Sequence, residues 1–357
     1  MAQFPSSYLK AAVVIVLGAF LFIIAAEFAA TSYVCNFGSR DFKVKTLNYH
    51  EYDECGVTPR YQPHPYLSYE NTPNVNTSEF VHNRYGFRGP NISQEKPDGT
   101  VRVALLGGSS TYSLGVESWK YDFARQLQEE LQKKYDYQKI QVINAGVVGY
   151  TSWESLVNLE FKVLPLDPDL VVVYHGVNDV TARLVDSSRY RADNTGYRKV
   201  WGEGGSLTAQ STLIRLLGGY PAPGLQKFVS HPTDISPERL KDNPPTHFRR
   251  NIRNIATISS ENNASVLLST WSYTTAYDDY VASPTYQKGI REQNSLIHTI
   301  ANRTKAAFYD FASDMPRARK YWDTGRHVNR RGAGLKGELF AEAIVSKGLL
   351  NDTATVR

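Results

Sequence analysis

The hydrophobic pattern of residues 101–179 predicts three strand–loop–helix units in succession. Three short runs are mostly apolar and rich in β-branched residues, which is typical of strands buried on both faces. Each run ends in a loop rich in Gly, Ser or Asn. Successive units of this kind form a doubly wound α/β fold, a parallel sheet flanked by helices with right-handed connections. The expected strands are 101–106, 141–145 and 169–174, and the expected helices are 121–135 and 152–164.

This alternation of predicted strands and helices is interrupted at 180–243 and then resumes. The interruption contains Gly- and Pro-rich stretches and no clean strand, so we expect an insertion or a lid over a site. One domain is therefore expected over 100–350, followed by a C-terminal tail at 351–357. Its later elements are expected as helix 248–261, strand 265–270, helix 290–303, strand 307–311 and helix 334–346.

An apolar run at 11–30 stands apart from the α/β pattern and is broken only by Glu27. About 20 apolar residues are enough to cross a bilayer. We therefore expect a transmembrane anchor at 10–30 behind a short N-terminal tail, 1–9. A cleaved signal peptide is the alternative, because small residues lie near the end of the run.

Two signals bear on the orientation of this segment. Arg40, Lys43 and Lys45 follow it, and this charge opposes a topology with the N-terminus inside. Cys35 and Cys55 are the chain's two cysteines, and such a pair predicts one disulfide in an oxidising compartment. Two unpaired buried thiols are the alternative. We expect a single-pass membrane protein whose main domain is extracytoplasmic.

Residues 31–99 join the anchor to the domain. The first part, to about residue 61, has mixed polarity and is interpreted as a stalk. Repeated prolines between 63 and 90 predict an extended strap rather than a helix. We expect the strap to pack against the edge of the domain, with contacts at the rim of a site as the alternative.

Composition excludes some classes of partner. The 357 residues are 41% hydrophobic and 21% charged, which is ordinary for a globular protein. The net charge of +5 is spread along the chain, so no nucleic-acid partner is expected. The sequence has no H-E-x-x-H, P-loop or dinucleotide-binding motif. We therefore expect no metal and no cofactor.

The loop after the first predicted strand carries the candidate nucleophile, Ser109, in the sequence Gly107-Gly108-Ser109. Two glycines allow a turn that residues with a Cβ resist. A serine just beyond that turn can lie at the carboxyl edge of the sheet, where open α/β folds bind their ligands.

A serine hydrolase also needs a base and a group that orients the base. His327 is the candidate base, because it lies between the last predicted strand and the last predicted helix and so returns to the same edge. Asp323, upstream of His327, is the candidate to hold the second imidazole nitrogen. His175, after the third predicted strand, is the alternative base.

Four short blocks in this order resemble those of the SGNH (GDSL-type) hydrolase family. The resemblance extends over about 102–350 and implies an SGNH-hydrolase, flavodoxin-like fold. The variant with Gly-Gly-Ser in place of Gly-Asp-Ser is similar to a bacterial branch that often has an N-terminal membrane segment. The blocks are Gly107-Gly108-Ser109, Asn144-Ala145-Gly146-Val147-Val148-Gly149, Gly176-Val177-Asn178-Asp179 and Asp323…His327.

The same resemblance implies a role for each matching residue. Ser109 would be the nucleophile and His327 the base. The oxyanion hole would consist of the backbone N–H groups of Ser109 and Gly149 and the side-chain amide of Asn178. Asp179, beside Asn178, is expected to brace its loop rather than to act on substrate.

One position departs from the family pattern. The family usually has Asp three residues before the His, whereas this chain has Thr324 there and Asp323 one residue earlier. A one-residue bulge would restore Asp323 to its role. Alternatively, a backbone carbonyl orients the imidazole, or the protein has lost activity.

The expected function is that of a serine esterase working through an acyl-enzyme. Its substrate would be an O-acetyl group on a carbohydrate, such as a polysaccharide, or a lipid ester. The alternatives are an O-acyltransferase with the same triad and a non-catalytic envelope-binding protein that retains the fold.

Overall fold

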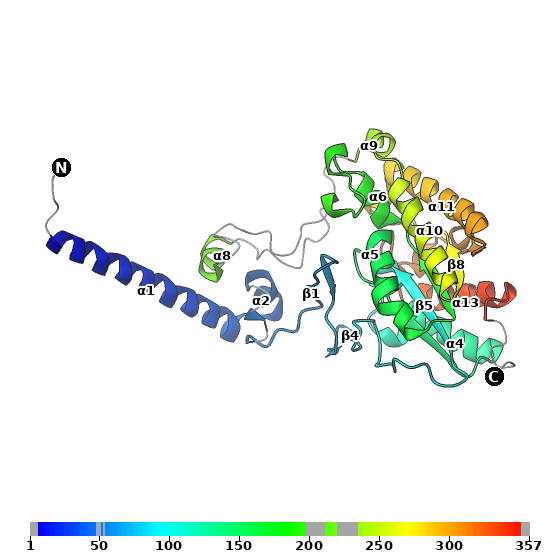
Figure 1. Ribbon diagram of the computed structural model, residues 1–357, viewed down its shortest axis with the longest axis horizontal. Coiled ribbons are helices and arrows are strands. Elements are labelled where there is room, and N and C mark those ends of the chain that lie inside the picture. Colours follow the sequence, from blue (N-terminus) through cyan, green and yellow to red (C-terminus); the bar gives the residue numbers. More distant parts are fainter. Residues whose placement is uncertain (1–5, 48–50, 53, 198–210, 220–234, 351–357) are drawn as a thin grey trace. The chain divides into compact units, whose positions relative to one another are not determined.

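The computed structural model consists of two compact units (Figure 1). The first comprises Met1–Gln62 and Val200–Phe228, and the second comprises Pro63–Lys199 and Val229–Arg357. The residues that the structure describes are 6–47, 51–52, 54–197, 211–219 and 235–350.

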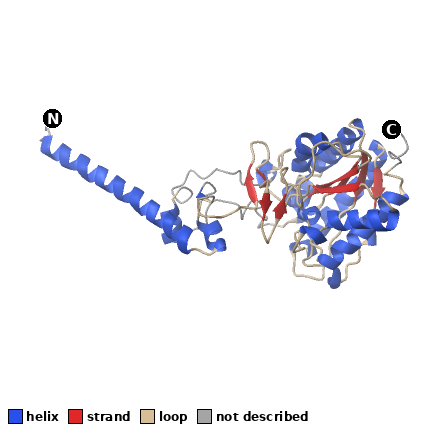
Figure 2. Ribbon diagram, turned by 90° about the horizontal axis from the view of Figure 1, so that it is seen from below, coloured by secondary structure: helices blue, strands red, loops and turns tan. Residues whose placement is uncertain are grey.

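A five-stranded parallel sheet forms the centre of the second unit (Figure 2). The strand order is β6-β5-β7-β8-β9, so the chain starts inside the sheet, adds β6 on one side and then builds outward on the other. The direction of winding reverses between β5 and β7, and the crevice beyond the carboxyl ends of two such strands is where open α/β sheets bind ligands. The strands are β5 (Val101–Gly107), β6 (Ile140–Asn144), β7 (Leu170–Tyr174), β8 (Ser265–Ser269) and β9 (Ala307–Tyr309).

Helices cover both faces of this sheet (Figure 1). Val103 and Leu105 of β5 belong to the core on one face, whereas Ala104 and Leu106 belong to the core on the other. This alternation explains why the strand is apolar at every position. The prediction of a doubly wound α/β fold is confirmed. Helices α4 (Phe123–Tyr135) and α13 (Arg330–Ser346) cover the first face, and α5 (Ser152–Asn158), α10 (Thr246–Glu261) and part of α11 (Pro284–Thr304) cover the second.

The strap follows the open edge of β6. It contains β2 (Tyr69–Asn71) and an antiparallel pair, β3 (Val75–Asn76) and β4 (Val81–His82). The backbone N–H of Arg88 then donates to the carbonyl of Asn144, the last residue of β6, at 3.2 Å. The strap therefore packs against the edge of the domain.

The predicted insertion at 180–243 divides between the two units. Helix α8 (Thr212–Gly218) belongs to the first unit, whereas α6 (Val177–Arg183) and α9 (Pro237–Asp242) belong to the second. Residues 198–210 and 220–234 of this segment lie outside the described residues. The remaining short elements of the second unit are α3 (Ser109–Tyr112), α12 (Phe311–Asp314), a π-helical turn (Leu159–Val163) and 3₁₀ turns at Trp119–Tyr121, Leu164–Leu166, Ser187–Arg189, Thr195–Tyr197, Tyr280–Ala282 and Arg319–Tyr321.

The first unit is built on the long helix α1 (Ser6–Phe37). Within it, Lys10–Phe37 includes an 18-residue stretch with a mean hydropathy of 2.6 and is long and apolar enough to cross a membrane. Helix α2 (Arg40–Thr46) follows, and Cys35 is joined to Cys55 by a disulfide with a Cα–Cα distance of 4.7 Å. A small core lies beside the disulfide and consists of Val34, Leu47, Tyr52, Cys55 and Val57. The unit ends within β1 (Tyr61–Pro63).

Candidate active site

Ser109 is the first residue of α3, directly after β5. The turn that presents it has no room for side chains. A Cβ on Gly107 would lie 2.5 Å from the carbonyl oxygen of Tyr174, and one on Gly108 would lie 2.6 Å from the amide nitrogen of Asn178. Both glycines are therefore required by close approach rather than by an unusual φ. They bring the serine to the carboxyl end of β7, where the sheet's winding reverses.

His327 lies against Ser109, although 218 residues separate them in the sequence. Its Nε2 is 2.8 Å from the Ser109 Oγ. The side chain comes from the loop before α13, and Asn329 begins that helix by accepting a hydrogen bond from the N–H of Gly332. Burial, helped by the charges of Arg326 and Lys336, lowers the pKa of His327 from 6.5 to about 3. The imidazole is therefore neutral at physiological pH and can accept a proton.

The other imidazole nitrogen faces a hydroxyl. The Oγ1 of Thr324 is 3.2 Å from Nδ1 of His327, and the same oxygen accepts from the backbone N–H of His327. Asp323 is bound to His327 through its backbone, with its N–H donating to the His327 carbonyl at 2.8 Å. Within 235–350, which the structure describes, the carboxylate of Asp323 makes no hydrogen bond with His327. The Asp323 side chain lies against Gly115 instead. The structure thus places Thr324, not Asp323, at this nitrogen, because the tight backbone pairing turns the Asp323 side chain away.

The expected oxyanion donors come from the loops after β5, β6 and β7. Asn178, in the first turn of α6, donates through Nδ2 to the carbonyl of Tyr150 at 2.9 Å. Gly149 has φ +84°, a conformation that favours glycine. Its carbonyl accepts from the hydroxyl of Tyr197 at 3.1 Å. The three sheet loops therefore meet at one edge, as parallel topology requires.

A cavity of about 10 Å³ lies at this edge and is lined in part by Gly108, Ser109 and Asn178. It has room for about one water-sized group. Ser109 and His327 are 7% and 6% exposed, so the hydroxyl and the imidazole lie beneath a nearly closed surface. The enclosed space matches a single oxygen atom better than a long chain.

A family model for the GDSL-like lipase/acylhydrolase family matches residues 105–335 of this sequence. The chain belongs to that family. The matched residues begin in β5 and end within α13, so the hydrolase domain contains all four sequence blocks. None of the curated protein sequences matches the chain.

Solved structures similar to the hydrolase include an acetyl xylan esterase, AlAXEase, with 17% identity and a TM-score of 0.43 over 69% of this chain and 99% of that one. A lipase/acylhydrolase from Enterococcus faecalis has 18% identity and a TM-score of 0.45, covering 70% of this chain and 97% of its own. TesA has 18% identity and a TM-score of 0.43, covering 70% and 99%.

His175, the alternative base, is not at the Ser109 hydroxyl. Its Nε2 is 2.8 Å from the Oγ of Ser155, and its Nδ1 is 3.7 Å from a carboxylate oxygen of Asp179. Asp179 accepts from the backbone N–H of Ser152 and from its hydroxyl, the latter at 2.6 Å. These contacts tie the start of α6 to the start of α5, so Asp179 braces the hydrolase loops as its position in the sequence indicated.

Lys336 is a residue of this site that sequence reasoning missed. It lies on α13, is 1% exposed, and donates through Nζ to the carbonyl of Ser110 at 3.1 Å. The Nζ also lies 3.7 Å and 4.2 Å from the ring centroids of Tyr174 and Phe123, within cation–π range. Burial lowers its pKa well below 10.5. One signal in the sequence could have identified it. Lys336 lies three residues after Ala333 and four before Phe340, so it shares the buried face of α13 with them.

The strap also holds α3, the short helix that begins at Ser109. The Arg88 guanidinium donates to the carbonyls of Tyr112, Ser113 and Val116 at 2.6 to 2.8 Å. His82 Nε2 lies 2.9 Å from the Tyr112 hydroxyl. The bonds to Tyr112 and Ser113 satisfy carbonyls at the end of α3, which a helix of one turn cannot satisfy itself. The strap therefore supports α3 from the edge of the hydrolase domain.

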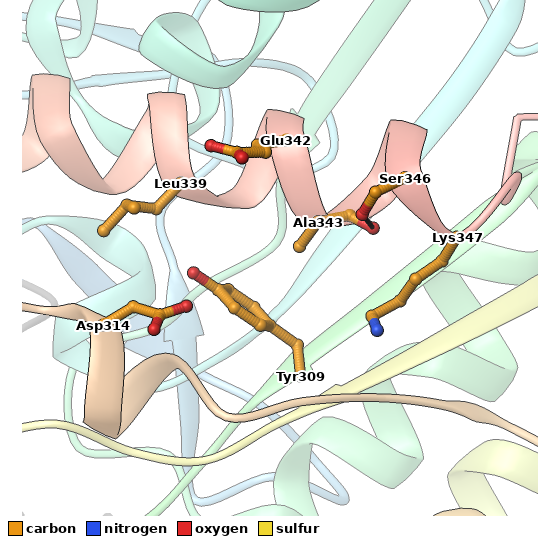
Figure 3. A pocket seen from close by; sticks show the side chains of 7 residues that line it. All are labelled: Tyr309, Asp314, Leu339, Glu342, Ala343, Ser346 and Lys347. Atoms are coloured by element: carbon orange, nitrogen blue, oxygen red, sulfur yellow. Dashed lines mark hydrogen bonds between the residues drawn. The ribbon is translucent and has the colours of Figure 1, made fainter.

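A larger pocket of about 530 Å³ lies elsewhere, at the C-terminal half of α13 (Figure 3). Figure 3 shows Tyr309 and Asp314 beneath the helix, with Glu342 on the helix and Lys347 just after its last residue. It shares no lining residue with the Ser109 cavity. Within the part of the chain that the structure describes, no group of three or more His, Cys, Asp or Glu side chains could hold a metal.

Proposed function

We propose that the protein is a serine esterase in which Ser109 is the nucleophile and His327 the base. The observation that carries this proposal is the 2.8 Å contact between Ser109 Oγ and His327 Nε2 at the carboxyl end of β5. Ser109 Oγ attacks the ester carbonyl while its proton passes to Nε2. The protonated imidazole then returns the proton to the leaving alkoxide, which gives an acyl-enzyme. Water, activated by the same imidazole, hydrolyses that intermediate.

The developing oxyanion would be stabilised by three donors. These are the N–H groups of Ser109 and Gly149 and the amide of Asn178. Support comes from the proximity of Asn178 to the Ser109 turn and from the left-handed backbone at Gly149. One donor of this type is typically worth about 3 kcal/mol of the barrier.

The group that orients the base is proposed to be Thr324 instead of Asp323. A hydroxyl at Nδ1 can accept the imidazole N–H and so favour the tautomer whose Nε2 is free to take a proton. Because a hydroxyl is neutral, it stabilises the imidazolium less than a carboxylate would. We therefore expect a smaller contribution from this third residue than the usual aspartate makes.

We further propose that α1 is a membrane anchor and that the hydrolase domain is extracytoplasmic. The length and hydropathy of Lys10–Phe37 support the anchor. The Cys35–Cys55 disulfide directly after it supports an oxidising compartment. An O-acetyl group on a carbohydrate, or the ester of a lipid, would be the substrate in that location.

The test is labelling of the full-length protein in detergent with a fluorophosphonate serine probe, with p-nitrophenyl acetate turnover measured alongside. The matched pair of variants is Ser109→Ala and Ser110→Ala, which differ by one position in the same turn. Loss of labelling in Ser109→Ala alone is expected. Wild-type protein that is folded and unlabelled would contradict the proposal and favour a non-catalytic protein. Products that appear only when a sugar acceptor is added would identify an acyltransferase.

A further inference from the structure

Helix α8 has the distribution of polar and apolar residues opposite to that of a helix on a soluble protein. Thr212 and Arg215 are buried, whereas Leu217 is 79% exposed and Leu213 and Ile214 are partly exposed. At 100° per residue these three apolar side chains share one face. A helix that faces water on one side would place them inside and the polar residues outside.

The buried face of α8 meets α1 at Glu27. The Glu27 carboxylate accepts from the Ser211 hydroxyl at 2.6 Å and from the backbone N–H groups of Thr212 and Leu213. Glu27 is the charged residue inside the apolar run of α1, where a carboxylate is costly unless it is paired. The first N–H groups of α8 have no partner within their own helix, so each side satisfies the other.

Further polar contacts continue along the same junction. Glu51 accepts from the hydroxyls of Thr31 and Thr212 at 3.1 to 3.2 Å. Arg215 donates through Nε to the carbonyl of Thr46 at 2.6 Å. Polar groups therefore gather where α8 meets α1, and Leu216 packs against the small core beside the disulfide. The other three apolar side chains of α8 face outward. This is the arrangement of segments surrounded by lipid, where charged and polar side chains turn towards protein.

Helix α8 contacts α1 near the end of the apolar run at 11–30. Residues 11–30 rise about 30 Å as a helix, which is the thickness of the hydrocarbon core. Glu27 lies in the last turn of this run, so α8 begins where the acyl chains end. The surface of α1 at this level is apolar and exposed, with Ile24 at 50% and Phe28 at 74%. Helix α8 lies beside α1 in the first unit (Figure 1). Its outward apolar side chains add to this exposed apolar surface.

We propose that α8 lies in the interface of the bilayer, with Leu213, Ile214 and Leu217 against lipid. The inference rests on the proposed anchor. It gives the predicted insertion a second role, because the chain returns to the membrane about 175 residues after α1 ends. The partner is the boundary between headgroups and acyl chains, which binds short apolar faces of this kind.

The experiment is bimane fluorescence of the full-length protein in phosphatidylcholine vesicles, with and without brominated acyl chains as quenchers. Single cysteines can be labelled selectively because Cys35 and Cys55 are paired. Leu217→Cys is the test position, and its high exposure means that the change removes little packing. Ile23→Cys reports on the anchor. Lys133→Cys, at a side chain 73% exposed on α4, is the control on the hydrolase domain.

We expect quenching at positions 23 and 217 to be several-fold greater than at position 133. Quenching at 23 with position 217 equal to position 133 would overturn the proposal for α8 and leave the anchor standing. Equal, weak quenching at all three positions would reject the anchor and the α8 proposal together. Leu217→Cys protein that keeps its esterase activity shows that the label reports on a folded chain.

Discussion

Among the residues that the structure describes, two buried serine–histidine pairs have the same short contact. Ser109 Oγ and His327 Nε2 are 2.8 Å apart, and Ser155 Oγ and His175 Nε2 are also 2.8 Å apart. The pKa of each histidine is lowered to about 3. The second pair even has a carboxylate, Asp179, 3.7 Å from its histidine, whereas the first has a threonine. By composition alone, the second pair is the better triad.

The surroundings of the two pairs decide between them. Ser155 lies inside α5 with no exposed surface, so no substrate can reach it. Ser109 lies on a glycine turn at the carboxyl end of a strand, beside Asn178. A nucleophile needs access and donors for the oxyanion as well as a base. A short Ser–His contact in a hydrolase therefore identifies a catalytic pair only together with its position in the fold.

The largest expected difference between the pairs is in turnover. Ser109→Ala is expected to lower kcat for p-nitrophenyl acetate by roughly 10⁴- to 10⁶-fold, the usual result of removing a nucleophile. Ser155→Ala is expected to leave kcat within a few-fold. It removes the partner of a buried imidazole nitrogen, so it should instead lower the free energy of unfolding by about 1–3 kcal/mol. Denaturant unfolding and steady-state kinetics on both variants check this, and equal loss of kcat in the two would refute the assignment.

The oxyanion donors provide the next difference. Asn178→Ala is expected to lower kcat by about 10²- to 10³-fold with little change in KM, because the amide acts on charge that develops in the transition state. Asn251→Ala is a control for loss of a buried amide, since Asn251 donates to the Ser152 hydroxyl in the bracing network around Asp179. That variant should lose stability and retain kcat. A raised KM with unchanged kcat in Asn178→Ala would count against an oxyanion role.

The group at Nδ1 is expected to have a smaller effect. Thr324→Val keeps the shape of the side chain and removes the hydroxyl, and a lost hydrogen bond of about 1.4 kcal/mol corresponds to roughly 10-fold in kcat. Asp323→Asn, one residue away, should change kcat by less than about 3-fold, because its carboxylate makes no hydrogen bond with the imidazole. The reverse order of the two effects would restore Asp323 to the role that its sequence position suggested.

These residues also show what can be predicted from the sequence. Strands β5 and β7 are continuous apolar runs because both of their faces are covered, so their pattern is visible without a structure. Ser109 and His327 can be paired because parallel topology returns every loop after a strand to one edge.

The residue at the imidazole stays open in the sequence, because the family spacing points to Thr324 whereas only Asp323 carries a carboxylate. The backbone pairing of Asp323 with His327 decides which side chain turns inward. The contact of α8 with α1 joins segments about 185 residues apart in the sequence, and no local pattern encodes it. Lys336 was overlooked because a lysine is usually solvated, and only the aromatic rings around it reveal that it is buried.

Acid stability should respond to both histidines. Each histidine has a pKa of about 3 in the folded protein and an ordinary pKa of 6.5, which applies to the unfolded chain. Between pH 3 and 6.5 the unfolded chain therefore binds more protons than the folded protein. The free energy of unfolding is therefore expected to fall as the pH is lowered from about 6.5 towards 3. His175→Gln should reduce this dependence without abolishing turnover. Thermal unfolding across this range, compared with the wild type, measures the effect.

The smallest expected effect comes from the charge of Lys336, which acts on His327 and is not among the causes that lower the pKa of His175. Three causes lower the pKa of His327: burial is the largest, the charge of Arg326 is next, and the charge of Lys336 is third. Burial is the cause that lowers the pKa of His175. The other groups that face His327 are the hydroxyls of Ser109 and Thr324. Lys336→Met removes the charge and keeps an unbranched side chain, so the pKa of His327 should rise. The base must be unprotonated to act, and the acid limb of kcat/KM should therefore move to higher pH.

The control for that shift is Lys347→Met, which removes an exposed lysine just after the same helix. Its pH profile should match that of the wild type. A purely structural role for Lys336 would lower kcat/KM equally at every pH and leave the acid limb in place, because loosening of α3 through the Ser110 carbonyl does not depend on the protonation of His327. A shifted limb in Lys336→Met alone would show that the buried ammonium acts on the imidazole at Ser109, a charge that the pair at Ser155 lacks.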